Sequence, residues 1–141
     1  MGNKKKMIVI SLILLTLLGI YFGKNYIEER RDKSSEETNV ITNLEDAKSG
    51  IPTLIMFKTD TCPYCVEMQE EISIVANKYP GKFNVYYARL EEEKNLELAY
   101  KYGAYVVPTT VFLDKDGSEF YTHQGLMRSN DIENVIKSLG V

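Results

Sequence analysis

The two cysteines of this chain, Cys62 and Cys65, are separated by two residues and lie between an apolar run and an amphipathic segment. The apolar run, residues 53–57, has the pattern of a short strand buried on both faces. After the cysteines, apolar residues recur at helical spacing, Pro63 suits the first turn of a helix, and Pro80-Gly81 would end it. The sequence therefore predicts that the cysteines lie where a buried strand leads into a helix.

The short spacing of the cysteines favours a redox role over a structural one. A cross-link stabilises a fold more as the loop that it closes grows, and a bridge from Cys62 to Cys65 closes almost no loop. The spacing suits two sulfurs that exchange between dithiol and disulfide. Two cysteines and the distant His123 cannot supply the four ligands of structural zinc, so we expect no metal site and no cofactor.

The rest of the chain alternates between strand and helix patterns. Residues 83–90 predict a second strand and residues 92–102 a helix, and this alternation implies parallel pairing. Residues 109–114 and 118–123 predict an antiparallel hairpin, because an Asp-Gly pair lies between them. A final amphipathic helix is predicted to begin near Asn130.

This order of elements resembles the thioredoxin fold, an α/β fold in which helices flank a central mixed sheet. The segment Lys-Tyr-Gly-Ala-Tyr-Val-Val-Pro-Thr at residues 101–109 is similar to the thioredoxin segment that carries a cis-proline. Residues 88–90 and Gly125 also fall where members of that family have comparable residues. The resemblance covers residues 44–141 and implies a thioredoxin-like domain.

The resemblance implies a thiol–disulfide oxidoreductase with Cys62 and Cys65 as its catalytic residues. Cys62 would lie at the N-terminus of the helix, where unpaired N–H groups and the helix dipole favour a thiolate. Cys62 would attack a substrate disulfide, and the more buried Cys65 would resolve the mixed disulfide. The residues expected to bind the substrate are Pro63, Tyr64, Val107 and Pro108.

Two details of the site follow from the same resemblance. Pro108 is expected to be cis and to stand beside the sulfurs, so that the main chain of Val107 can pair with an extended substrate. The dipeptide Pro63-Tyr64 between the cysteines is similar to that of glutaredoxins. It implies a reduction potential of roughly −200 to −230 mV, compared with about −270 mV for thioredoxin.

Three positions depart from the thioredoxin pattern. Met56 replaces the buried acid that helps to move the proton of the resolving thiol, and Thr61 replaces a tryptophan. Asp60 brings a negative charge near the attacking sulfur, which would oppose its ionisation. Glu67 is a candidate proton acceptor, although a glutamate on an exposed helix face is usually only solvated. The sequence thus leaves open which group handles the proton of Cys65.

The N-terminal segment has the order of an export signal. Lysines at residues 4–6 precede an uncharged apolar run at residues 7–22. Because no Ala-x-Ala pattern follows the run, we favour an uncleaved anchor, one N-terminal transmembrane helix within residues 1–23, over a cleaved signal peptide. Residues 24–43 are predicted to form a charged linker to the domain at residues 44–141.

These features lead to an expectation for location and partners. The net charge of −3 offers no basic stripe for nucleic acid. We expect a monomer at the cell membrane of a bacterium, with the redox domain outside the cytoplasm. Its partners would be exported or cell-surface proteins or peptides with thiols or disulfides, together with an unidentified redox partner. The direction of electron flow stays open.

Two other functions stay open from the sequence. The Cys-Pro-Tyr-Cys motif behind an anchor also resembles accessory oxidoreductases dedicated to one exported peptide, such as a bacteriocin. The chain could instead be a membrane-tethered binding module without catalysis, although both cysteines are present.

Overall fold

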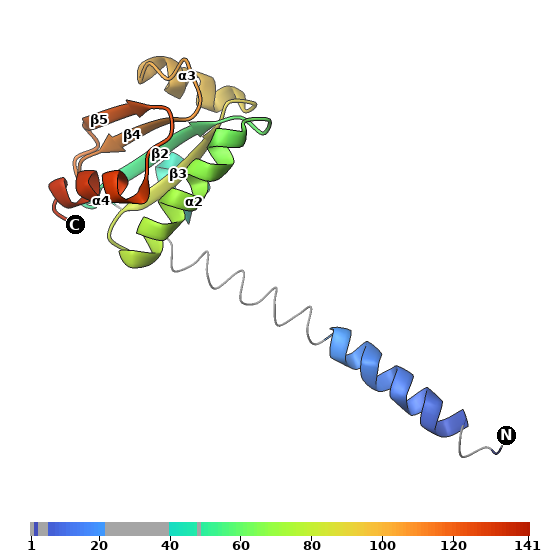
Figure 1. Ribbon diagram of the computed structural model, residues 1–141. Coiled ribbons are helices and arrows are strands. Elements are labelled where there is room, and N and C mark those ends of the chain that lie inside the picture. The colour runs from blue at the N-terminus through green and yellow to red at the C-terminus, as the bar shows by residue number, and fades with distance from the viewer. Residues whose placement is uncertain (1, 3–5, 22–39, 48) are drawn as a thin grey trace. The chain divides into compact units, whose positions relative to one another are not determined.

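The computed structural model in Figure 1 describes residue 2 and residues 6–21, 40–47 and 49–141. The chain divides into two compact units, Met1–Ser35 and Glu36–Val141. In the first unit, residues 6–21 form a helix. Among the described residues, no helix is both long enough and apolar enough to cross a membrane, so the span predicted within residues 1–23 is not found. Residues 24–39 of the predicted linker lie outside the described residues.

The second unit is built on one mixed sheet of five strands in the order β1-β3-β2-β4-β5. The parallel part comprises β1 (Val40–Ile41), β3 (Asn84–Arg89) and β2 (Thr53–Lys58). The strands β4 (Thr109–Leu113) and β5 (Glu119–Gln124) form an antiparallel hairpin, and β4 is also antiparallel to β2. The predicted mixed sheet is confirmed.

The sheet begins earlier in the chain than the sequence predicted. The strand β1 pairs with β3 through Val40 and Ile41, which the sequence analysis had placed in the linker. A strand of two residues leaves no alternating pattern that sequence reading could recognise. The sheet thus includes two residues that precede the predicted start of the domain at residue 44.

Helices cover both faces of the sheet (Figure 1). The helices α2 (Pro63–Lys78) and α4 (Ser129–Ser138) pack on one face, and α3 (Glu93–Lys101) packs on the other. The short 3-10 helix η1 (Leu44–Asp46) joins the α3 side. The three helices predicted for this domain are thus confirmed, with ends that differ by only a few residues.

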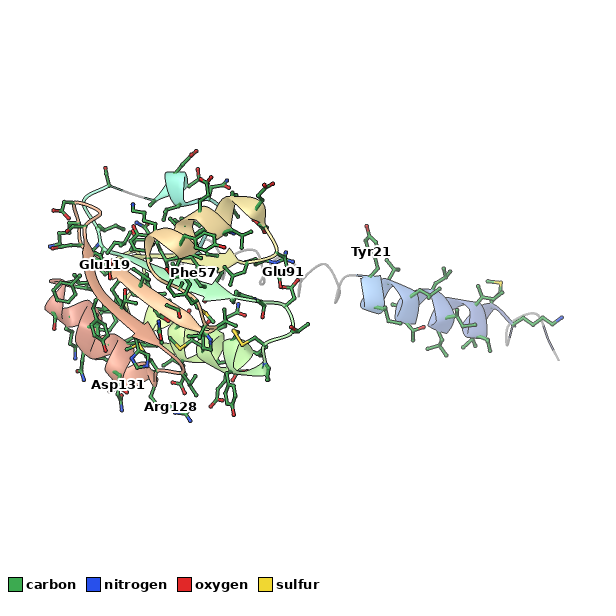
Figure 2. The ribbon with its side chains drawn as sticks, turned by 90° about the horizontal axis from the view of Figure 1, so that it is seen from above. Tyr21, Phe57, Glu91, Glu119, Arg128 and Asp131 are labelled. Atoms are coloured by element: carbon green, nitrogen blue, oxygen red, sulfur yellow. A yellow bond between two sulfur atoms is a disulfide. The ribbon has the colours of Figure 1, made fainter. Side chains whose placement is uncertain are left out.

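The strand β2 is buried on both faces, as its apolar run predicted. Leu54 and Met56 face the cluster formed with α2 and α4, while Ile55 and Phe57 face the cluster on the α3 side. All four side chains are fully buried, and Phe57 is labelled within the sheet in Figure 2. A rigid central strand therefore fixes the loop that follows it, which carries the cysteines.

Candidate functional site

Cys62 and Cys65 form a disulfide at the N-terminus of α2, with their Cα atoms 5.2 Å apart. Cys62 is the N-cap residue with an extended backbone, and Pro63 is the first residue of the helix. The N–H of Cys65 donates to Sγ of Cys62 over 3.2 Å. The cysteines thus occupy the strand-to-helix junction that the sequence predicted.

The two sulfurs differ in their access to solvent. Cys65 is 1% exposed and belongs to the core cluster under α2 and α4, whereas Cys62 is only partly buried at the edge of that cluster. In the dithiol form, the first-turn N–H groups and the helix dipole favour a negative charge on Cys62. The sulfur of Cys62 is therefore the more accessible one to another molecule, whereas the buried sulfur of Cys65 has Cys62 as its neighbour.

Pro108 is preceded by a cis peptide bond, as predicted. Its carbonyl oxygen accepts from the N–H of Gly125 at 2.7 Å, and the hydroxyl of Thr109 donates to the carbonyl of Val106 at 2.6 Å. Val107 packs against the core cluster that also borders Cys62. The proline segment is thus held at the same cluster as the disulfide.

The other two residues predicted to bind substrate lie next to Cys62. Pro63 is exposed, and Tyr64 is 63% exposed. The structure contains no ligand, so the binding roles of these residues and of Val107 and Pro108 stay predictions. Because the side chain of Tyr64 is exposed and the residue lies between the two cysteines, it is accessible to a binding partner.

Asp60 forms an ion pair that the sequence did not predict. Arg89, at the end of β3, donates to its carboxylate at 2.5 Å, and the N–H of Asp60 donates to Glu91 at 2.9 Å. The carboxylate raises the pKa of Arg89 above its usual value, first through this hydrogen bond and then through its charge. The negative charge expected to oppose ionisation of Cys62 therefore has a cation beside it.

Glu67 forms an ion pair with Arg128 that the sequence analysis did not predict. Its carboxylate accepts from Arg128 at 2.7 Å, and Arg128, the N-cap residue of α4, also donates to Glu71 at 3.1 Å. Glu71 in turn accepts from the N–H of Ser129 at 2.8 Å, and these bonds lower the pKa of Glu71. The pair of acids ties α2 to α4, and the hypothesis that Glu67 replaces the buried acid loses its support.

The sequence analysis missed Thr110, which lies opposite Met56 in the sheet. Thr110 is fully buried, and its hydroxyl has no hydrogen-bond partner among the described residues. No local sequence signal could have found it, because its position opposite Met56 depends on the register between β2 and β4. His123, its neighbour on β5, lines a cavity of about 290 Å³ that neither cysteine borders.

A metal site has no support in the described ranges, where no group of three or more His, Cys, Asp or Glu side chains could hold an ion. The arrangement at α2 instead offers one accessible sulfur, one buried sulfur and a reversible bond between them. Such an arrangement is chemically suited to disulfide exchange.

Comparisons with known proteins place this geometry in context. A family model described as a thioredoxin-like domain matches residues 44–140. A solution structure of an uncharacterized thioredoxin-like protein from Clostridium perfringens is 72% identical, with a TM-score of 0.68, over 72% of this chain and 81% of that one. A malaria parasite thioredoxin-2, described as a component of the protein secretion machinery, is 22% identical with a TM-score of 0.59 over 71% of this chain and 92% of that one, and it shows the fold alone.

Two curated relatives are less similar in sequence than the Clostridium perfringens protein. The chloroplastic thioredoxin-like protein HCF164 of Arabidopsis thaliana is 28% identical over 92 residues, which are 64% of this chain and 35% of that protein. Its counterpart in Oryza sativa is 30% identical over 79 residues, which are 55% of this chain and 30% of that protein. The chain thus spans about a third of the length of the curated relatives that it matches.

Proposed function

Because the chain belongs to the thioredoxin-like family, we propose that it is a thiol–disulfide oxidoreductase that acts on cysteines of proteins or peptides. The observation that supports this proposal most is the disulfide between Cys62 and Cys65 at the N-terminus of α2. The cis Pro108, which borders the same cluster through Val107, adds to it.

The proposed reaction is a pair of thiol–disulfide exchanges. The Cys62 thiolate attacks one sulfur of a substrate disulfide, which forms a mixed disulfide and releases a substrate thiolate. Cys65 then attacks Cys62, so that the Cys62–Cys65 bond forms while the bond to the substrate breaks. The substrate gains two electrons and two protons, and the enzyme loses them. The reverse sequence oxidises a substrate dithiol.

Tyr64 and the main chain of Val107 are the proposed substrate contacts. The exposed ring of Tyr64 stands beside the accessible sulfur, and Val107 precedes the cis Pro108. An extended substrate strand that pairs with the main chain of Val107 would bring its own sulfur toward Cys62. Backbone pairing of this kind accepts many peptide sequences, because its hydrogen bonds do not depend on the substrate's side chains.

We also propose that the N-terminal unit attaches the protein to the cell membrane and that its substrates are exported or cell-surface proteins. The large apolar side chains of the helix at residues 6–21 are exposed, and lysines precede them. Membrane fractionation tests this part: the full chain should sediment with membranes and resist alkaline extraction. Recovery of the full chain in the supernatant would contradict the attachment.

Turnover of a disulfide substrate tests the enzymatic proposal. The full chain, supplied with a thiol reductant, should accelerate the reduction of insulin, and Cys62→Ser should abolish the acceleration. The variant Thr122→Val, with a change on the opposite face of the sheet from the cysteines, serves as the folded control. Equal turnover by wild type and Cys62→Ser would reject the mechanism.

A further inference from the structure

Thr110 presents a buried hydroxyl whose hydrogen-bonding capacity is unused. Its side chain is 0% exposed, and no residue in the described part of the chain forms a hydrogen bond with its Oγ1. A buried hydroxyl without a partner disfavours the folded state, so most such groups are paired. A threonine at this position indicates that a partner exists in another state of the protein.

The sheet register places this hydroxyl on the face of the sheet that α2 covers. Thr110 is directly opposite Met56, and cross-strand partners share one face of a sheet with their Cβ atoms about 5 Å apart. Met56 and Cys65 belong to the same buried cluster. Thr110 also lies only two residues beyond the cis Pro108. The hydroxyl therefore lies on the same face of the sheet as Met56, which shares its buried cluster with Cys65.

A reduced Cys65 would offer the Thr110 hydroxyl a hydrogen-bond partner that the disulfide form does not. The structure contains the oxidised form, in which Cys65 is bonded to Cys62 and carries neither a proton nor a charge. Reduction gives Cys65 a thiol that can donate a hydrogen bond or a thiolate that can accept one strongly. We propose that the Thr110 hydroxyl is the hydrogen-bond partner of Cys65 in the reduced protein, directly or across one water molecule.

This inference rests on the proposed function and assigns the stabilisation of the Cys65 thiolate, which the thioether of Met56 cannot provide. In the resolving step, Cys65 must lose its proton before its sulfur attacks Cys62 and displaces the substrate thiolate, which takes up a proton. The O–H of Thr110 donates to the Cys65 thiolate and stabilises it for this attack. Thr110 is thus a positioning residue that acts through Cys65.

Other titratable groups border the same face of the sheet. Lys58 is bound to Gln69 of α2 at 2.8 Å, and burial raises the pKa of Tyr87. The titratable side chains of the strands on this face include Lys58, Tyr87, Arg89, Tyr121 and His123; those of α4 are Asp131, Glu133 and Lys137; and those of α2 besides Cys65 are Tyr64, Glu67, Glu70, Glu71 and Lys78. Of these, His123 is the cross-strand neighbour of Thr110, so it needs a variant of its own in the test.

The redox equilibrium of Thr110→Val with glutathione tests the proposal. Valine removes the hydroxyl that would bind reduced Cys65 but keeps the branched shape of the threonine side chain. The equilibrium of the full-chain variant should therefore favour the disulfide roughly tenfold more than that of wild type. This change corresponds to a reduction potential about 30 mV more negative. The pH midpoint of the resolving step should rise. Thr110→Ser should retain the wild-type equilibrium, and Thr122→Val and His123→Gln should not reproduce the change.

Unfolding experiments on both redox forms separate this role from a general effect on the fold. Thr110→Val should lower the stability of the reduced protein and leave that of the oxidised protein unchanged or higher. An equilibrium within twofold of wild type, or an equal loss of stability in both forms, would overturn the proposal. If wild type cycles with glutathione and substrate while Thr110→Val behaves identically, only this inference fails. If wild type does not cycle, the proposed function fails with it.

Discussion

The backbone N–H of Cys65 points at Sγ of Cys62 from a distance of 3.2 Å. This contact is available only because Cys62 caps the helix and Pro63 begins it. In the reduced protein, the same N–H would meet a thiolate, which accepts a stronger hydrogen bond than a neutral sulfur.

The pKa of Cys62 is therefore expected to lie below the usual value of about 8.5. Thiolate absorbance of the reduced full chain, measured against pH, gives this pKa directly, with Cys62→Ser as the blank. Cys65, which lies in apolar surroundings, should titrate at higher pH. A single transition near 8.5 for both thiols would contradict the assignment of Cys62 as the attacking sulfur.

Arg89 is predicted to keep the charge of Asp60 from opposing the thiolate. The variant Arg89→Ala leaves Asp60 without its cation, so the pKa of Cys62 should rise in low salt, and the rise should shrink in high salt. The measurement is the pH dependence of alkylation of Cys62.

A double variant provides the matched control. Asp60→Asn combined with Arg89→Ala removes both charges and should restore the pKa of Cys62. If Arg89→Ala and the double variant gave the same pKa, the ion pair would have no electrostatic influence on the sulfur.

Glu71 is predicted to stabilise the junction between α2 and α4. Its carboxylate accepts from the N–H of Ser129, the first residue of α4, and so acts as a cap supplied by another helix. Glu71→Ala should cost about 1 kcal/mol of unfolding free energy, the usual effect of losing a helix cap. Urea unfolding measures the loss, and Glu70→Ala, on the exposed side of α2, should change stability much less.

Glu133 gives the fold a defined dependence on pH. Hydrogen bonds from Lys137, Lys78 and Tyr79 lower its pKa from 4.5 to about 2. Because the folded pKa is depressed, the stabilisation is complete above pH 4.5 and is lost as the pH falls toward 2. The free energies of unfolding of wild type and Glu133→Gln should differ at about pH 7 and become equal near pH 2. A difference that stays constant over this range would refute the assignment.

Much of the fold could be predicted because its signals are local. The apolar run of β2, the helical periodicity after Cys65 and the Asp-Gly turn of the hairpin each fix an element within a few residues. The cysteine pair and Pro108 could be found for the same reason, since each stands at the end of a recognisable element.

The features that the sequence analysis did not predict depend on contacts between segments that are distant in the sequence. The pairing of Asp60 with Arg89 joins residues 29 positions apart, and the position of Thr110 opposite Met56 depends on the register of β2 and β4. The strand β1 exists only through its pairing with β3. None of these relationships leaves a pattern in a short window of sequence.

Trapping of the mixed disulfide tests the central claim most directly. Reduced Cys65→Ser, prepared as the full chain, should react with a disulfide-containing peptide and accumulate a covalent adduct, because a serine hydroxyl in place of the resolving thiol cannot displace the peptide. Mass spectrometry of the digested adduct should locate the peptide on Cys62, and the Cys62→Ser variant should give little adduct. Absence of an adduct with Cys65→Ser, or equal adduct formation with Cys62→Ser, would contradict the account.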